Sequence, residues 1–133
     1  LKRLDKFIKA RKKIAGIYNK AFKKFSDKLK LPSDNKDFSS SWHIYILRLR
    51  GSLAKKRGEV FKKLREAGIG AQVHYLPVYL HPYYQSLGYK KGLCPKAEEY
   101  YETAISLPIF LDLKLKDQKF VIKKLNEILK SYL

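Results

Sequence analysis

The segment GIGAQVHYLPVYLHPYY, residues 68–84, concentrates the side chains of this chain that are best suited to contact a ligand. It holds four tyrosines, two of the three histidines and two prolines. Tyrosine rings stack on sugars and bases while their hydroxyl groups form hydrogen bonds, and histidine exchanges protons near neutral pH. Two interpretations follow: a strand and loop packed on a core, or the wall of a ligand site.

Two histidines and one arginine bear on whether these strands line a core or a ligand site. His74 falls at the end of a predicted strand that opens into a loop, where binding residues are often found, and a core histidine is an equal alternative. His43 lies within an apolar strand and is interpreted as a satisfied core or interface histidine. Arg48, in the same strand, needs an anionic partner, which either a protein carboxylate or a ligand could supply. The tyrosines also suit a subunit interface.

Other chemistries lack their usual motifs in this sequence. It contains no Gly-rich phosphate loop of the expected spacing and no nucleophile elbow. His74 and His81 are seven residues apart across a proline, which matches no helical pair of metal ligands, so no zinc site is predicted. Cys94 directly precedes Pro95 at a predicted helix start and is interpreted as a cap residue rather than a nucleophile. The residues alone predict an aromatic, basic ligand wall and no particular reaction.

The charge of the chain supports a second interpretation. Its 133 residues, the size of one domain, include 30 Lys and Arg against 12 Asp and Glu, a formal net charge of +18. Such a charge attracts polyanions, so a stand-alone basic nucleic-acid-binding module is the alternative hypothesis. Only six of the basic residues are Arg, the residue that reads bases best. This balance favours a general compositional bias, and no specific nucleic-acid partner is expected.

Composition also bears on the environment of the protein. The single cysteine fits a reducing cytoplasm, and a cytoplasmic protein is expected. No apolar run approaches the ~18 residues that span a bilayer, so no membrane association is expected. The chain has no methionine and begins with Leu1. We therefore expect it to be part of a longer protein.

Hydrophobic periodicity predicts alternating helices and strands. The predicted helices are 1–30, 52–68, 94–104 and 116–133, the predicted strands are 42–50, 71–76 and 105–110, and the main loops are 32–41 and 79–92. Ser52 is a predicted N-cap, Gly68 a predicted C-terminal stop and Pro95 a predicted first-turn residue. Because the strands are few and short, we predict an α+β fold in two layers, with a small, mainly antiparallel sheet covered by helices.

Several motifs together resemble one known family. GIGAQVHYLPVYLHPYY, followed by GYKKGLCPKAEEYYETAISLPIFLDL and DQKFVIKKL, resembles the C-terminal domain of the DegT/DnrJ-type sugar-nucleotide aminotransferases. RLDKFIKARKKIAGIYNK resembles the helix that leads into that domain, and SSSWHIYILRL resembles its first strand. The resemblance covers nearly the whole chain. It is greatest to the transaminases that aminate a UDP-linked 4-keto hexosamine in pseudaminic acid-type pathways.

The resemblance implies an enzyme of which this chain is one part. Residues 1–31 would form a long linking helix and residues 32–133 the C-terminal small domain of a fold-type I pyridoxal-phosphate enzyme. The large domain, which carries the Schiff-base lysine and binds pyridoxal phosphate, would be absent. The whole enzyme, a homodimer, would move an amino group from glutamate to a nucleotide-linked keto sugar for cell-surface polysaccharide or glycan biosynthesis. This chain would be inactive alone, and some related enzymes are dehydratases instead.

The resemblance also implies which residues face the ligand. None in this chain would be catalytic, cofactor-binding or metal-binding. The residues expected to bind the nucleotide sugar are His74, Tyr75 and Tyr79, followed by Trp42, His43 and Arg48. Many relatives read PVHLQPYY where this chain reads PVYLHPYY, so Tyr79 stands in place of a histidine. A histidine's role is therefore not carried over to that position.

Overall fold

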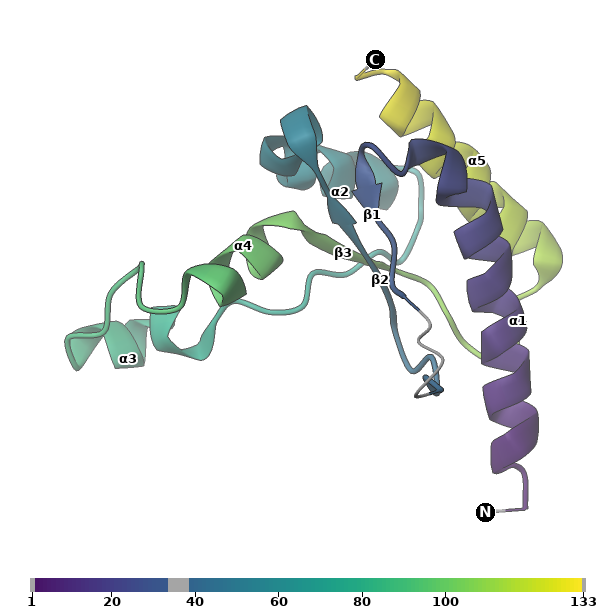
Figure 1. Ribbon diagram of the computed structural model, residues 1–133, viewed down its shortest axis with the longest axis horizontal. Coiled ribbons are helices and arrows are strands. Elements are labelled where there is room, and N and C mark those ends of the chain that lie inside the picture. The colour runs from purple at the N-terminus through teal and green to yellow at the C-terminus, as the bar shows by residue number, and fades with distance from the viewer. Residues whose placement is uncertain (1, 34–38, 133) are drawn as a thin grey trace.

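The computed structural model describes residues 2–33 and 39–132 and is built on a three-stranded antiparallel sheet (Figure 1). The strands are β1 (Leu29–Lys30), β2 (Tyr45–Leu49) and β3 (Ala104–Leu107), in the order β1-β2-β3. Leu29 lies opposite Leu49, and Tyr45 lies opposite Leu107. A small antiparallel sheet with helices is the predicted α+β fold class, which is confirmed.

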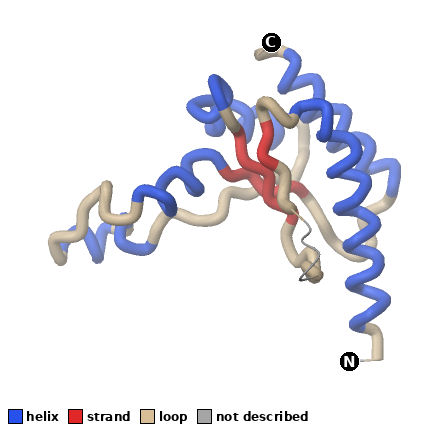
Figure 2. Tube along the Cα trace, in the orientation of Figure 1, coloured by secondary structure: helices blue, strands red, loops and turns tan. Residues whose placement is uncertain are grey.

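Helices form most of the rest of the described chain (Figure 2). The α-helices are α1 (Leu4–Phe22), α2 (Arg57–Glu66), α3 (Pro82–Ser86), α4 (Pro95–Thr103) and α5 (Leu115–Lys130), and the 3-10 helices are η1 (Lys23–Phe25), η2 (Gly51–Lys56) and η3 (Val78–Leu80). Pro95 occupies the first turn of α4, as predicted, because its missing N–H has no partner there in any case. Gly68 follows α2 with φ +76°, a left-handed conformation that suits glycine and confirms the predicted stop.

The core lies between one face of the sheet and the helices α1, α2 and α5. Tyr45, Leu47 and Leu49 alternate along β2 with less buried residues, so their side chains share the face that enters the core. Tyr18 of α1 packs on Tyr45 with ring centroids 4.9 Å apart and donates a hydrogen bond to the Pro108 carbonyl. Burial raises the pKa of both tyrosines, so both stay neutral across the physiological range.

The first predicted helix is too long at its C-terminal end. We expected it to reach about Lys30, but α1 ends at Phe22 and residues 29–30 form β1. The physical reason is the pairing of Leu29 and Lys30 with β2, which helical periodicity cannot anticipate. Ser52 is also not a side-chain cap, because the 3-10 helix η2 precedes α2 and neither start has such a bond. Residues 34–38 of the predicted loop 32–41 lie outside the described residues.

The predicted strand 71–76 is largely wrong. Only Gln72 pairs with the sheet, through two backbone hydrogen bonds with Ser106 of 3.1 and 2.9 Å. In the antiparallel register set by Gln72, Leu76 would lie opposite Glu102, which belongs to α4, so strand pairing cannot reach the end of the predicted strand. The predicted loop 79–92 likewise contains α3 and the end of η3 rather than irregular chain alone.

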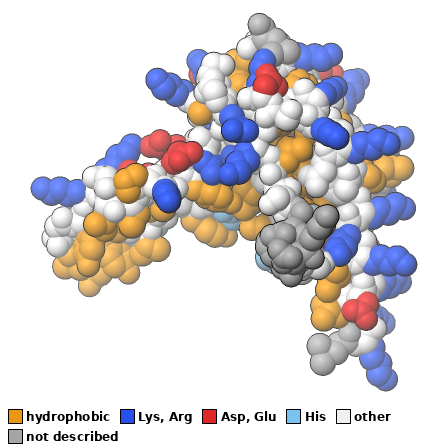
Figure 3. Space-filling view, in the orientation of Figure 1, with side chains coloured by type: hydrophobic (Ala, Val, Ile, Leu, Met, Phe, Trp, Pro, Cys, Tyr) orange, Lys and Arg blue, Asp and Glu red, His pale blue; other side chains and the backbone are white. Residues whose placement is uncertain are grey.

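Residues 77–94 form an arm that projects from the body of the domain, with α3 near its tip (Figure 1). The arm leaves the body after the Gln72 bridge and returns at the start of α4. It exposes large apolar side chains, among them Val78, Tyr83, Leu87 and Leu93. Apolar side chains gather along one side of the arm in Figure 3. An exposed apolar surface of this kind marks contact with another molecule or chain segment.

Candidate functional site

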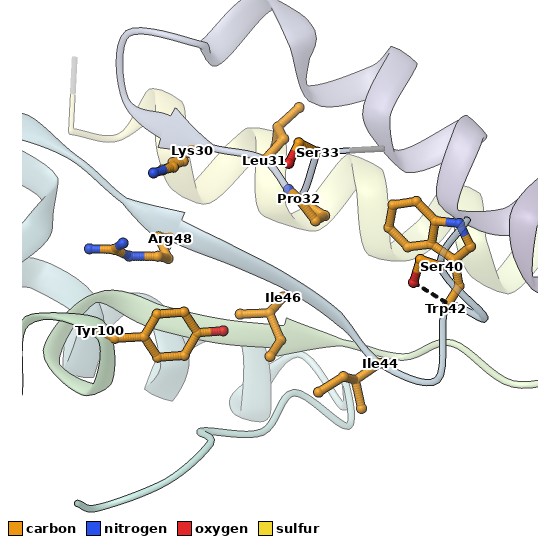
Figure 4. A pocket seen from close by; sticks show the side chains of 10 residues that line it. All are labelled: Lys30, Leu31, Pro32, Ser33, Ser40, Trp42, Ile44, Ile46, Arg48 and Tyr100. Carbon is orange, nitrogen blue, oxygen red and sulfur yellow. Dashed lines mark hydrogen bonds between the residues drawn. The ribbon is translucent and has the colours of Figure 1, made fainter. Parts of the chain in front are cut away.

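The face of the sheet that turns away from the core carries the candidate site. Ile44, Ile46 and Arg48 alternate with the core residues of β2, and Ser106 of β3 lies directly opposite Ile46. Two grooves border this open face. The first, of about 380 Å³, is lined by residues from β1, β2 and α4 together with Trp42 (Figure 4). The second is larger, about 790 Å³.

The second groove, here called the ligand groove, brings together three of the predicted site residues. Its lining includes His43, His74 and Tyr75, with Lys96 and Tyr100 from α4. His74 and Tyr75 meet edge to face, with ring centroids 4.6 Å apart. The Tyr75 side chain is 76% exposed, so its ring can be covered by a flat ligand. The groove thus combines aromatic walls with imidazole and ammonium groups.

His74 is anchored to the sheet by a side-chain contact with β3. Its Nε2 atom lies 2.8 Å from the Oγ atom of Ser106, whose side chain is buried. Ser106 is the residue that also pairs with Gln72 through the backbone. The half-buried His74 ring is therefore held against β3 while it lines the groove. Sequence reasoning found His74 but missed Ser106, because nothing in the sequence indicates which β3 side chain lies next to it.

Trp42 and His43 are held where the chain enters β2. The backbone carbonyls of both residues accept hydrogen bonds from Nη1 of Arg11 in α1, at 3.0 and 2.6 Å. Trp42 has φ +52°, an unusual conformation for a bulky residue, and its side chain is only 3% exposed. Its indole packs on Tyr45, 6.1 Å between centroids, and borders the first groove. The structure thus gives Trp42 a packing role and leaves its predicted contact with ligand untested.

Arg48 has partners within the protein. Its Nη2 atom lies 2.5 Å from Oε1 of Glu99, its Nε atom donates to Oγ1 of Thr103 at 3.1 Å, and its guanidinium lies 5.3 Å from the Tyr100 ring centroid. These groups all belong to α4. The protein carboxylate that the sequence left as one alternative is present, so Arg48 fastens α4 to β2 at the border of the first groove.

The hydroxyl group of Tyr79 is used inside the protein. It donates to Oε1 of Glu98 at 2.5 Å and accepts the N–H of Cys94 at 3.2 Å, while the N–H of Gly92 donates to the same carboxylate oxygen at 2.6 Å. Glu98 itself is 7% exposed. We call these four residues the latch, because they tie η3 to the end of the arm and to α4.

The latch shifts the acid–base behaviour of its members. The hydrogen bond from Tyr79, followed by that from the Gly92 N–H, lowers the pKa of Glu98. Burial, followed by the bond to Glu98, raises the pKa of Tyr79. Both directions favour an ionised Glu98 that accepts a hydrogen bond from a neutral Tyr79 across the physiological range. Tyr79 is a predicted ligand residue that the structure places in this network rather than on the lining of either groove.

The remaining chemistry-bearing residues lie apart from the ligand groove. His81 is exposed on the arm, and Cys94 is exposed at the start of α4 without a side-chain capping bond. Within residues 2–33 and 39–132, no three His, Cys, Asp or Glu side chains come together as metal ligands would. The cations at the grooves are Lys30 and Arg48 in the first and Lys96 in the second. Because Arg48 is already paired with Glu99, the cations that can attract an anionic ligand are Lys30 at the first groove and Lys96 at the second.

The sheet, the helices around it and the projecting arm have the arrangement found in solved aminotransferases. The chain belongs to the DegT/DnrJ/EryC1/StrS aminotransferase family, which its residues 1–126 match. The resemblance inferred from the motifs is therefore confirmed. Among the described residues, no helix is both long enough and apolar enough to cross a membrane.

Three similar proteins illustrate the match. The spore coat polysaccharide biosynthesis protein SpsC of Bacillus subtilis is 38% identical over 134 residues, which cover 98% of this chain and 34% of SpsC. The UDP-4-amino-4,6-dideoxy-N-acetyl-beta-L-altrosamine transaminase of Campylobacter jejuni is 36% identical over 133 residues, with coverage of 98% and 34%. The PLP-form of Spr1654 from Streptococcus pneumoniae superposes with a TM-score of 0.88 at 28% identity, covering 100% of this chain and 34% of that one. The chain spans about a third of the length of the curated relatives it matches.

Proposed function

We propose that this chain is the substrate-side wall of a pyridoxal-phosphate-dependent aminotransferase that moves an amino group from glutamate to a nucleotide-linked keto sugar. The observation that carries the proposal is the ligand groove, in which His74, Tyr75 and Lys96 converge, in a chain of this family. The names of the relatives place two of them in spore coat polysaccharide biosynthesis and in amination of a UDP-linked sugar. We extend that role to the synthesis of a surface polysaccharide or glycan.

The residues of this chain do not fit the cofactor itself. A lysine that forms a Schiff base is desolvated or electrostatically tuned so that its amine is neutral. Among the described residues, every lysine is exposed or half-buried. Pyridoxal phosphate, when bound, supplies the electron sink for amino transfer, and we assign its binding to a large domain outside this chain. The proposed division is a linking segment at residues 1–31, which consists of α1, η1 and β1 rather than one helix, and a small domain at residues 32–133.

The proposed work of this chain is to bind and orient the nucleotide sugar. Tyr75 offers an exposed ring for stacking, and His74 offers an imidazole held in one orientation by Ser106. Lys96 supplies a positive charge that favours the diphosphate of the substrate. The apolar remainder of the lining, Ile44, Pro77 and Ala97 among it, excludes water once the ligand is seated. We also propose a homodimer in the cytoplasm.

The test joins this chain to its natural upstream coding region and follows the visible absorption of added pyridoxal phosphate. A coloured adduct that glutamate bleaches, formed only by the longer protein, supports the proposal. Tyr75→Ala should then raise the KM for the nucleotide sugar and leave the absorption spectrum unchanged. Tyr83→Ala, an exposed arm tyrosine outside the ligand groove, is the matched control and should leave KM unchanged. A longer protein that binds no cofactor would contradict the proposal.

The same spectra separate the alternatives left by the sequence. Binding of the cofactor without a lysine adduct, together with loss of water from the sugar, would indicate a dehydratase instead. If no cofactor is bound, oligonucleotide affinity at several salt concentrations tests the nucleic-acid alternative. Tight, sequence-dependent binding at physiological salt would support a dedicated module, and weak binding lost at moderate salt would reflect the net charge of +18 alone.

A further inference from the structure

The pairing of β3 with the segment after α2 places a buried hydroxyl group beside a groove histidine. Gln72 and Ser106 lie opposite each other, and in extended chain alternate side chains share a face of the sheet. His74, two residues beyond Gln72, therefore returns to the face that carries Ser106. The side chains meet diagonally, with Nε2 of His74 2.8 Å from Oγ of Ser106.

The hydrogen-bond donors and acceptors around Ser106 indicate which atom donates the hydrogen in this contact. The Ser106 hydroxyl has one hydrogen and two acceptors within reach, the His74 Nε2 atom at 2.8 Å and the Gln72 carbonyl at 3.4 Å. The Gln72 carbonyl already accepts the backbone N–H of Ser106 at 2.9 Å, so it is satisfied without the hydroxyl. The hydroxyl can instead accept from Nε2–H and donate to the Gln72 carbonyl, but that arrangement uses the longer contact of 3.4 Å. The shorter contact therefore favours donation from the Ser106 hydroxyl to Nε2.

We propose that Ser106 is a positioning residue that fixes the orientation and the tautomer of His74. When Nε2 accepts the hydroxyl hydrogen, the proton of the neutral imidazole resides on Nδ1. The two ring nitrogens point in nearly opposite directions, so Nδ1–H is directed away from β3. His74 then presents a hydrogen-bond donor to the ligand groove, suited to an oxygen atom of a phosphate or of a sugar. The identity of the ligand rests on the proposed function, whereas the tautomer does not.

A His74 ring whose orientation and tautomer are fixed should bind a ligand more tightly than a ring that is free to rotate. An imidazole that rotates, or that exchanges tautomers, must be ordered each time a ligand binds, and this ordering lowers affinity. Ser106 is 5% exposed and lies in the middle of the sheet between β2 and the Gln72 bridge, so its hydroxyl is itself firmly placed. The buried serine thus acts through His74 without touching the ligand.

The direct test is the nitrogen-15 NMR spectrum of the imidazole rings in the 133-residue chain at pH 8.5, above the ordinary titration range of histidine. The chain has three histidines, and the exposed rings of His43 and His81 serve as internal references. His74 should show a protonated Nδ1 and an unprotonated Nε2. A His74 ring with its proton on Nε2 in the unaltered chain would overturn the proposal, and this result needs no variant.

Variants test whether Ser106 is the cause. Ser106→Ala should shift His74 toward the Nε2–H form, and Ser106→Thr, which keeps a hydroxyl at a strand position that tolerates β-branching, should retain Nδ1–H. Ser86→Ala, an exposed arm serine, is the matched control and should leave the His74 signals unchanged. An unchanged His74 tautomer in a folded Ser106→Ala chain would overturn the assignment.

Kinetics of the longer protein supply the functional readout. Because one net hydrogen bond changes affinity by roughly three- to tenfold, Ser106→Ala should raise the KM for the nucleotide sugar by about that factor with little change in kcat. Ser106→Thr should restore it. An unchanged KM would overturn the positioning role. A longer protein that turns over no nucleotide sugar would instead remove the proposed function, while the NMR result would still decide the tautomer.

Discussion

The contacts of Arg48 permit a quantitative test of whether it is a structural residue or a ligand residue. Arg48→Met keeps most of the side-chain length but removes the guanidinium. Glu99 is 68% exposed, so its ion pair contributes about 0.5 kcal/mol. The hydrogen bond to Thr103 contributes about 1 kcal/mol and the contact with the Tyr100 ring about 0.5 kcal/mol. The free energy of unfolding should therefore fall by about 2 kcal/mol.

A double-mutant cycle separates the ion pair from the other contacts of Arg48. Glu99→Gln alone should lower the free energy of unfolding by about 0.5 kcal/mol, and the coupling between the two positions should be about as large. The assay is urea unfolding, followed by the fluorescence of the buried Trp42 and by circular dichroism. Arg50→Met is the matched control, because Arg50 is exposed at the end of the same strand, and should change stability by less than about 0.5 kcal/mol.

Two outcomes would refute this account of Arg48. If Arg48→Met leaves the free energy of unfolding unchanged but raises the KM for the nucleotide sugar in the longer protein, the guanidinium serves the ligand rather than α4. If the coupling with Glu99 exceeds about 2 kcal/mol, the pair behaves as a desolvated ion pair, which contradicts the exposure of Glu99.

Two further predictions concern the latch and the end of α2. The folded state lowers the pKa of Glu98, so its ionised form stabilises the fold above the ordinary carboxyl pKa. This contribution is lost as pH falls through the lowered pKa. Between pH 7 and pH 3, the thermal unfolding temperature of the unaltered chain should therefore fall more steeply than that of Glu98→Gln. Equal slopes would exclude a stabilising latch. Gly68→Ala should lower the free energy of unfolding by about 1 kcal/mol in chemical denaturation, because φ is +76°. No neighbouring atom crowds the new methyl group, so backbone strain is the main cause. Gly70→Ala, where φ is not positive, is the control and should lower the free energy of unfolding by less.

Local signals predicted the elements that local physics determines. Aromatic and β-branched composition marked the strand that contains Tyr45–Leu49, and the apolar stripe of Leu115–Lys130 marked the last helix. Gly68 and Pro95 marked helix ends because each satisfies a backbone requirement that neighbouring residues impose. The fold class followed from these elements because so few short strands form only a small sheet.

Pairings between distant segments could not be predicted in the same way. The pairing of β1 with β2 depends on residues that return to the sheet after α1, and helical spacing extends past that point. The segment after Gln72 has the composition of a strand, but the residue opposite its end belongs to α4. Aromatic and imidazole composition located His74 and Tyr75 at a groove, whereas Ser106 became relevant only through the register of β3.

The latch also determines how related chains can diverge in length. The backbone N–H of Cys94 donates a hydrogen bond to the Tyr79 hydroxyl at the base of the arm. The residues between them therefore form a loop whose two ends are already held together. Doubling the length of such a closed segment costs only about 0.6 kcal/mol in chain entropy. Insertions, deletions or a transplanted tip between these two residues can therefore be accommodated without re-pairing the sheet. The arm is therefore the part of this domain best suited to tolerate changes in length and sequence.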